Sequence, residues 1–234
     1  MNRTIISCLG IVMSLLMLTC GTDSKPKQPV EIIKVEQPTG QTTDAAKPAT
    51  KNKTILFFGN SLTAGAGIDL SDAFSSIIER KIDSLKMDYT VINSGISGET
   101  TAGGLSRIDW ILEQQPIDIF ILELGGNDGL RGIDPKSSYS NLQAIIDKVK
   151  AKYPQVIIVL AGMEAPPNMG DEFTSAFRGM FPRLAKANNL PLIPFFLDKV
   201  AGVAELNQAD GIHPTEEGHR IVAENIWEVL EPLL

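Results

Sequence analysis

Cysteine is nearly absent from this chain. Its 234 residues include only Cys8 and Cys20, both close to the N-terminus. If the segment before Cys20 is removed as a leader and Cys20 itself is modified, the domain that follows contains no free thiol. Disulfides and thiolate nucleophiles both require cysteine. The sequence therefore excludes a disulfide framework and a cysteine nucleophile from that domain.

Clusters of basic residues are also missing. The formal net charge is −7 and the isoelectric point is near 4.9. No group of Lys and Arg is interleaved with aromatic residues, as a nucleic-acid-binding surface would require. We therefore expect no nucleic-acid partner, and the acidity mainly favours solubility.

No apolar run is long enough for a comfortable membrane span. The stretch from Ile5 to Leu18 follows Arg3 and falls short of the ~20 residues that a spanning helix needs. It predicts a signal peptide over residues 1–19. Cys20 directly after it favours a lipoprotein that is lipidated on this cysteine. Because Met17-Leu18-Thr19 departs from the usual Leu, small, Gly/Ala pattern, ordinary secretion and an uncleaved anchor remain open. The sequence thus predicts a bacterial envelope location, periplasmic or surface-exposed and lipid-anchored, or otherwise a secreted protein.

Residues 20–52 are rich in Lys, Pro, Thr, Gln and Asp and have little apolar periodicity. Such composition predicts a disordered tether, or a leader that acts only as a spacer. Residues 53–234 suffice for one α/β domain with a sizeable core, and nothing in them requires a second domain. They contain no internal repeat.

Within this domain, apolar runs alternate with amphipathic segments. The runs predict strands at Thr54–Phe58, Tyr89–Asn93, Ile117–Leu124, Val156–Ala161 and Leu192–Pro194. The amphipathic segments predict helices near 72–86, 104–115, 138–152, 173–189 and 215–231, with Asp72 and Thr215 as N-caps of the first and last. The alternation predicts an α/β fold, a three-layer α/β/α sandwich around a parallel sheet.

Two short motifs provide the side chains of a serine hydrolase. Ser61, in Gly59-Asn60-Ser61, follows the first predicted strand at the point where loop begins. Asp210 and His213 are three residues apart, so that one loop can hold the carboxylate against the imidazole. We expect Ser61 as nucleophile, His213 as its base and Asp210 as the group that orients the base.

Three groups are candidates for the oxyanion hole. They are the backbone N–H of Ser61, the backbone at Gly98 and the side-chain amide of Asn127. Gly98 lacks a Cβ and so lets a substrate approach closely, and Asn127 lies among glycines that leave room around its amide. Both follow predicted strands, so both should lie at the same sheet edge as Ser61.

These residues resemble the SGNH (GDSL-like) hydrolases, in which Ser, Gly, Asn and His occur in separated blocks, here at Ser61, Gly98, Asn127 and His213. The strings around Gly98 and Asn127 are similar to the bacterial periplasmic branch of acyl-CoA thioesterases, lysophospholipases and arylesterases. The resemblance implies a flavodoxin-like sheet of five parallel strands, no metal and no cofactor. One departure is that the usual Gly-Asp-Ser begins here as Gly59-Asn60-Ser61, and we expect the nucleophile turn to survive this change because an amide also forms hydrogen bonds.

The resemblance also implies a mobile loop over Gly129–Pro135 that shapes the acyl pocket. Gly129 and Leu130 are therefore candidate substrate-binding residues, together with Pro166 in the apolar, proline-rich loop after the fourth strand. That loop has the alternative role of covering the edge of the core. Glu99 and Arg131 are candidates for contact with a substrate head group, or are solvated loop charges. For Asp128 we expect a structural role in its glycine-rich turn, and for His219, the other histidine, a solvated or packing role in the last predicted helix.

The sequence thus favours an exported serine hydrolase of carboxylic esters or thioesters, such as lysophospholipids, acyl thioesters or aryl esters. An alternative within the same chemistry is an O-acetyl esterase acting on envelope carbohydrate. A different class, a flavin- or nucleotide-binding module, is suggested by the loop after the first strand but leaves Asp210 and His213 unexplained. A binding lipoprotein that has lost its activity is a further alternative, against which the intact set of side chains argues.

Overall fold

The structure is a computed structural model that describes residues 51–234. The predicted signal peptide, the lipidation site Cys20 and nearly all of the predicted tether lie outside the described residues. Within residues 51–234, no helix is both long enough and apolar enough to cross a membrane.

Five parallel strands form one sheet with the order β2-β1-β3-β4-β5. The strands are β1 (Lys53–Gly59), β2 (Tyr89–Gly95), β3 (Ile119–Glu123), β4 (Ile157–Ala161) and β5 (Leu192–Ile193). This order reverses between β1 and β3, as in the flavodoxin-like doubly wound folds. The predicted five-stranded parallel sheet is confirmed. The ends of each strand differ from the predicted ends by at most two residues.

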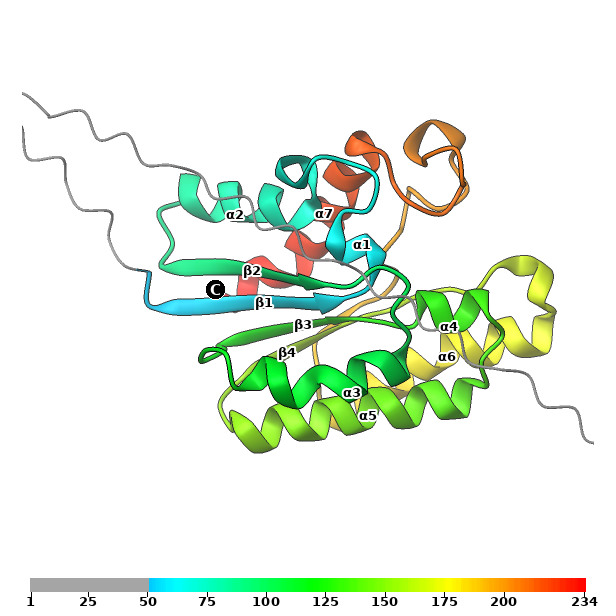
Figure 1. Ribbon diagram of the computed structural model, residues 1–234, viewed down its shortest axis with the longest axis horizontal. Helices are drawn as coiled ribbons and strands as arrows, with labels where there is room; N and C mark the ends of the chain where they lie inside the picture. The colour runs from blue at the N-terminus through cyan, green and yellow to red at the C-terminus, as the bar shows by residue number, and fades with distance from the viewer. Residues whose placement is uncertain (1–50) are drawn as a thin grey trace, which may run out of the picture. The chain divides into compact units, whose positions relative to one another are not determined.

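Helices cover both faces of the sheet. The longer ones are α2 (Phe74–Ser84), α3 (Thr101–Leu112), α5 (Pro135–Lys152), α6 (Asp171–Asn188) and α7 (Glu216–Leu230). Two short helices begin shortly after strands end: α1 (Ser61–Ala64) after β1, and α4 (Gly126–Leu130) after β3. In Figure 1, α2 and α7 lie on one side of the sheet and α3, α5 and α6 on the other, so the predicted three-layer sandwich is confirmed.

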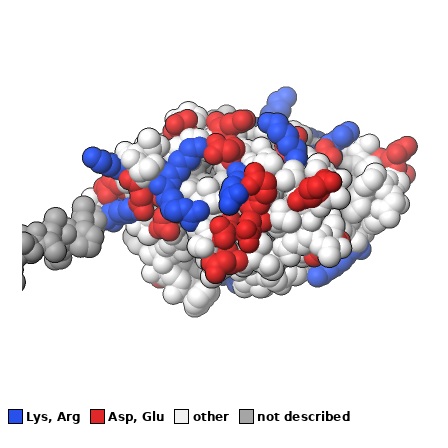
Figure 2. Space-filling view, turned by 90° about the horizontal axis from the view of Figure 1, so that it is seen from above, with Lys and Arg blue, Asp and Glu red and all other residues white. Residues whose placement is uncertain are grey.

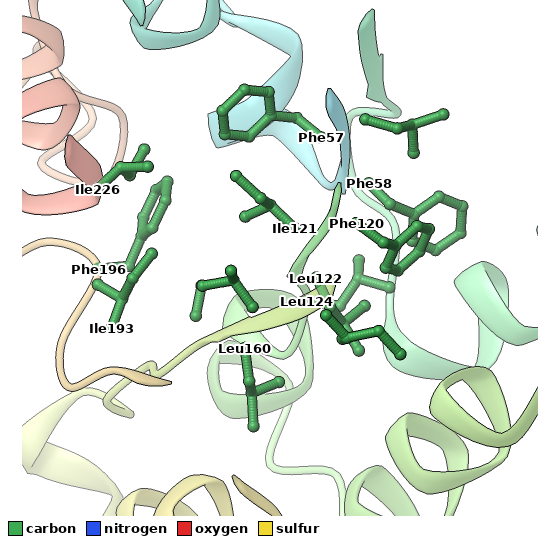
Figure 3. Packing of buried hydrophobic residues seen from close by; sticks show 14 of the residues in the cluster. Phe57, Phe58, Phe120, Ile121, Leu122, Leu124, Leu160, Ile193, Phe196 and Ile226 are labelled. Carbon is green, nitrogen blue, oxygen red and sulfur yellow. The ribbon is translucent and has the colours of Figure 1, made fainter. Parts of the chain in front are cut away.

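Buried strands join the two helical layers. The side chain of Phe57 packs edge-on against Phe74 of α2, whereas its neighbour Phe58 packs against Phe120 on the other face. Figure 3 shows Phe57 and Phe58 pointing away from each other, with Ile121 and Leu122 of β3 nearby. Because successive side chains of a strand point to opposite faces, a continuous apolar run is needed wherever both faces are covered.

The predicted N-cap of α2 is wrong. Asp72 belongs to a short 3-10 helix (Leu70–Asp72), and the N-cap position of α2 is Ala73, which forms no side-chain cap. The backbone N–H of Phe74 instead donates to Nδ1 of His219, at 3.3 Å. The cap thus comes from α7, which is distant in sequence. At α7 itself, Thr215 accepts from the Gly218 N–H at 3.3 Å, as predicted.

Charged side chains are mixed on the surface. On the face drawn in Figure 2, acidic and basic residues lie next to one another, with broad uncharged areas between them. Several are paired across helices, for example Lys148 with Asp109 and Lys81 with Glu224, both at 2.7 Å. Exposed pairs of this kind contribute little to stability, typically below about 1 kcal/mol each.

Candidate active site

The carboxyl ends of the strands bring the candidate site residues together. Ser61 follows β1, Gly98 follows β2 and Asn127 follows β3, and all three line one cleft together with His213. This edge is where ligands bind in open parallel sheets.

Ser61 is the first residue of α1 and is mostly buried. Asn60 is the N-cap of this helix, and its Oδ1 accepts from the Leu62 N–H at 2.9 Å. Because the first N–H groups of a helix have no acceptor within the helix, the N–H of Ser61 is suited to bind an anion that forms beside its own Oγ. Four helical residues then end at Gly65, which has a left-handed φ of 70°.

A chain of two short contacts links three side chains. Oγ of Ser61 lies 2.8 Å from Nε2 of His213. Nδ1 of His213 lies 2.6 Å from Oδ2 of Asp210. With the proton on Nδ1 held by the carboxylate, Nε2 is left to accept the proton of Ser61.

Hydrogen bonds within the loop hold Asp210 and His213 in place. Oδ1 of Asp210 accepts from the N–H groups of Ile212 and His213 at 2.9 and 3.0 Å. The Gln208 N–H donates to the carbonyl of His213 at 2.7 Å. The hydrogen bonds from the His213 ring and from these two backbone N–H groups lower the pKa of Asp210 to about 2. Asp210 is therefore a carboxylate throughout the neutral range.

The two other oxyanion candidates are held by their neighbours. Gly98 has a φ of 78°, which favours glycine, and Arg131 donates to its carbonyl at 3.0 Å. Nδ2 of Asn127 donates one hydrogen to the carbonyl of Glu99 at 3.0 Å. Its second hydrogen can point into the cleft, where the oxyanion would form.

Glu99 and Arg107 anchor the loop that contains Gly98. Glu99 is 8% exposed, and its carboxylate receives Nε and Nη2 of Arg107 at 2.7 and 2.6 Å. The same guanidinium donates to the carbonyl of Ser94 at 2.8 Å and stacks on the Phe58 ring. Glu99 is thus part of a bidentate ion pair that ties the loop to α3, and it does not line the cleft.

Asp128 has the structural role expected for it. Its carboxylate is buried and accepts from the Thr101 N–H, the Thr101 hydroxyl and the Ser138 hydroxyl at 2.9, 2.6 and 2.9 Å. These bonds join α4 to the first turns of α3 and α5. His219 is 1% exposed and packs on Phe74, again as expected.

The cleft itself has a volume of about 720 Å³, within the range of small-molecule sites. Beyond the polar groups around Ser61, its wall is largely apolar. The apolar lining residues are Leu62, Ala66, Leu130, Met163, Ala165, Pro166, Pro167, Phe195, Leu197, Ala201 and Ile212.

Two of the three predicted substrate-binding residues line this cleft, namely Leu130 and Pro166. Gly129 does not. A Cβ on Gly129 would contact the ring of Phe177, so this glycine serves the packing of α4 against α6. Gly129 and Leu130 also lie within α4, so the segment predicted as a loop over Gly129–Pro135 is irregular only at residues 131–134.

Sequence reasoning missed the environment of the nucleophile turn. Glu123, the last residue of β3, is fully buried beneath Asn60 and accepts hydrogen bonds from Asn60 and Thr63. Its signal was a single carboxylate at the end of the apolar run Ile119-Phe120-Ile121-Leu122. No group of three or more His, Cys, Asp or Glu side chains within residues 51–234 is arranged to hold a metal ion.

A doubly wound α/β domain with a serine, a histidine and an aspartate linked at its rim defines a class of hydrolytic enzymes. Comparison with known proteins identifies the family. The GDSL-like Lipase/Acylhydrolase family matches residues 57–221, and the chain belongs to it. The resemblance to SGNH hydrolases is thereby confirmed, and the chain is a carboxylic ester hydrolase.

Individual relatives agree with this assignment. The chain is 37% identical to Esterase TesA of Pseudomonas aeruginosa over 78% of its own length and 90% of the relative. It is 35% identical to Thioesterase 1/protease 1/lysophospholipase L1 of Escherichia coli K12, over 77% and 85%. The crystal structure of TesA superposes with a TM-score of 0.75 at 37% identity and covers 78% of this chain and 100% of that one. The alternative of a flavin- or nucleotide-binding module is not supported.

Proposed function

We propose that this protein is an exported serine hydrolase that cleaves carboxylic esters and thioesters through an acyl-serine intermediate. The observation that carries the proposal is the 2.8 Å contact between Oγ of Ser61 and Nε2 of His213, whose other nitrogen is held by Asp210. A serine hydroxyl is a weak nucleophile at neutral pH, and a base in direct contact with it removes this limitation.

Catalysis proceeds in two halves. In the first, His213 takes the proton of Ser61 as Oγ bonds to the acyl carbon, and the N–H groups of Ser61 and Gly98 and the Asn127 amide bind the resulting oxyanion. The carbonyl re-forms as the C–O or C–S bond breaks, and His213 gives its proton to the departing alcohol or thiol. In the second half, His213 activates a water molecule that releases the acid and restores the hydroxyl of Ser61.

The shape and chemistry of the cleft support acyl groups longer than acetyl. The same cleft that contains Ser61 is lined by apolar side chains such as Met163, Pro166 and Phe195. Each buried methylene contributes about 0.8 kcal/mol of transfer free energy. Relatives named arylesterase, thioesterase and lysophospholipase support the same substrate classes.

A series of p-nitrophenyl esters from acetate to palmitate tests the proposal. We expect turnover by the wild type, loss of nearly all of it in Ser61→Ala, and a rise of kcat/KM with chain length beyond acetate. Full turnover by Ser61→Ala would refute the mechanism. A steep preference for acetate over every longer chain would instead favour the O-acetyl esterase alternative.

For localisation, we propose an envelope enzyme anchored through a lipid on Cys20. Support comes from the short apolar segment Ile5–Leu18 and the cysteine that follows it. Metabolic labelling with a radioactive fatty acid in an expressing bacterium tests it. Label that is lost in Cys20→Ser supports the anchor, whereas an unlabelled, secreted wild type contradicts it.

A further inference from the structure

The residue that precedes the nucleophile, Asn60, packs against a buried acid. Asn60 is 1% exposed and Glu123 is 0% exposed. Nδ2 of Asn60 donates to Oε1 of Glu123 at 2.8 Å, and the backbone N–H of Asn60 donates to Oε2 at 3.2 Å. The hydroxyl of Thr63 donates to the same Oε2 at 2.8 Å. One carboxylate thus receives three hydrogen bonds from the turn that carries Ser61.

The orientation of the Asn60 amide is fixed by its other end. Oδ1 accepts the Leu62 N–H, which only an oxygen can do, so the NH₂ group must face Glu123. Asn60 therefore bridges the Leu62 N–H in the first turn of α1 and the carboxylate of Glu123. Its acceptor end caps the helix, and its donor end binds Glu123.

An aspartate at position 60 would form this bridge differently. It would place a second carboxyl oxygen 2.8 Å from Oε1 of Glu123, where the amide nitrogen now lies. Two carboxylates at this separation cannot both be ionised without strong repulsion, so they would have to share a proton. Asparagine supplies the hydrogen permanently, at any pH.

Within residues 51–234, no charged side chain forms a hydrogen bond or ion pair with Glu123. All its partners among the described residues are neutral donors on the turn after β1. Arg107 donates to the Gly59 carbonyl at 3.4 Å, but its ion-pair partner is Glu99. His213 contacts Oγ of Ser61, and no hydrogen bond joins it to Glu123. Burial raises the pKa of Glu123 to about 7, and the three donors oppose that rise by stabilising the carboxylate. Above that pH Glu123 is ionised, and the bridge to Asn60 then needs no proton on a carboxyl group.

We propose that Glu123 and Asn60 are positioning residues for the nucleophile, and that the amide of Asn60 frees this enzyme from a shared proton that an aspartate would require. The inference rests on the proposed function, since it concerns how Ser61 is held. The hydrogen bonds between Asn60 and Glu123 do not involve the substrate, and both residues act through the placement of Oγ and of the Ser61 N–H.

Four proteins test this inference: the wild type, Glu123→Gln, Asn60→Asp, and the double variant Asn60→Asp/Glu123→Gln. The double variant is the matched control. It reverses the direction of one hydrogen bond, keeps one carboxylate in the pair, and preserves an acceptor for Thr63 and for the backbone of residue 60. The readouts are kcat and KM for p-nitrophenyl butyrate from pH 6 to 9, corrected for spontaneous hydrolysis, and the midpoint of thermal unfolding.

In Glu123→Gln, the new amide places a donor against a donor. We expect kcat to fall by about tenfold or more with KM within about threefold of wild type, because the effect is on the position of Ser61. In Asn60→Asp, we expect kcat near the wild-type value at pH 6 and about tenfold below it at pH 9, as the shared proton is lost. The double variant should recover kcat to within about threefold of wild type and lose the alkaline decline.

The inference is overturned if Glu123→Gln keeps wild-type kcat, if the pH profiles of Asn60→Asp and wild type coincide, or if the double variant is as slow as Glu123→Gln. Should Glu123→Gln fail to fold, the pH profiles of Asn60→Asp and of the double variant still test the inference, since each of these variants retains a carboxylate in the pair. If Ser61→Ala keeps wild-type turnover, the proposed function itself fails. If Ser61→Ala is inactive and Glu123→Gln is unimpaired, only this inference fails.

Discussion

The imidazole of His219 is buried against Phe74, and this predicts that the domain loses stability in mild acid. Its Nδ1 accepts the Phe74 N–H, while Nε2 has no hydrogen-bond partner within residues 51–234. Burial, and to a lesser extent the nearby charge of His213, lowers the pKa of His219 from 6.5 to about 4. The folded protein therefore holds this histidine neutral over a pH range in which the unfolded chain protonates it.

The size of the effect follows from linkage. Between pH 6.5 and pH 4 the unfolded state binds more protons than the folded state at this site, so stability falls as the pH falls. A difference of about 2.5 pKa units at about 1.4 kcal/mol per unit corresponds to a loss of about 3 kcal/mol by pH 4. This is a large fraction of the stability of an ordinary domain.

Urea unfolding of wild type and His219→Asn at pH 7 and pH 4 measures this loss of stability. The amide oxygen of asparagine can replace Nδ1 as the acceptor for α2 but cannot be protonated in this range. Taking the difference between the two proteins cancels groups common to both, including Glu123, whose raised pKa makes stability fall as pH rises from about 4.5 to 7. We expect the variant to gain about 3 kcal/mol relative to wild type on going from pH 7 to pH 4. A difference that stays constant with pH would refute the reasoning.

Three further changes should act in distinct ways. Asn127→Ala removes one oxyanion donor and should lower kcat about 100-fold or more, with little change in KM for p-nitrophenyl butyrate; an unchanged kcat would remove this amide from the mechanism. Asp210→Asn keeps the shape but not the charge that orients His213, and stopped-flow acylation should slow by up to about 10⁴-fold; acylation at the wild-type rate would argue against that role. Gly59→Ala should cost about 1–3 kcal/mol or more in urea unfolding, because the added Cβ would overlap Thr63 and Glu123; unchanged stability would show that the turn can relax.

Much of the fold is readable from the sequence because burial on both faces leaves a local signal. The run Ile119-Phe120-Ile121-Leu122 is fully buried, and a short continuous apolar run is typical of a strand covered on both faces. Ser61 and His213 were expected to meet because each lies in a recognisable motif. Their separation of 152 positions along the chain gives no local signal.

The parts that sequence reasoning missed are long-range polar contacts. The acceptor that caps α2 is His219 on α7, which is distant in sequence. Local residue preferences could not reveal it and pointed to Asp72 instead. Glu123 belongs to an apolar strand but turns its carboxylate to the nucleophile turn. Gly129 was assigned to substrate binding by resemblance, whereas the ring of Phe177 occupies the space beside it. In each case the partner is known only once the sheet has brought the elements together.

In the proposed mechanism, His213 activates Ser61 for covalent attack. Intact-protein mass spectrometry after brief exposure to a fluorophosphonate tests it most directly. The account predicts one adduct per chain on Ser61, none on Ser61→Ala, and much slower labelling of His213→Ala. Adduct formation at full rate on Ser61→Ala, or at any other residue of the wild type, would contradict it.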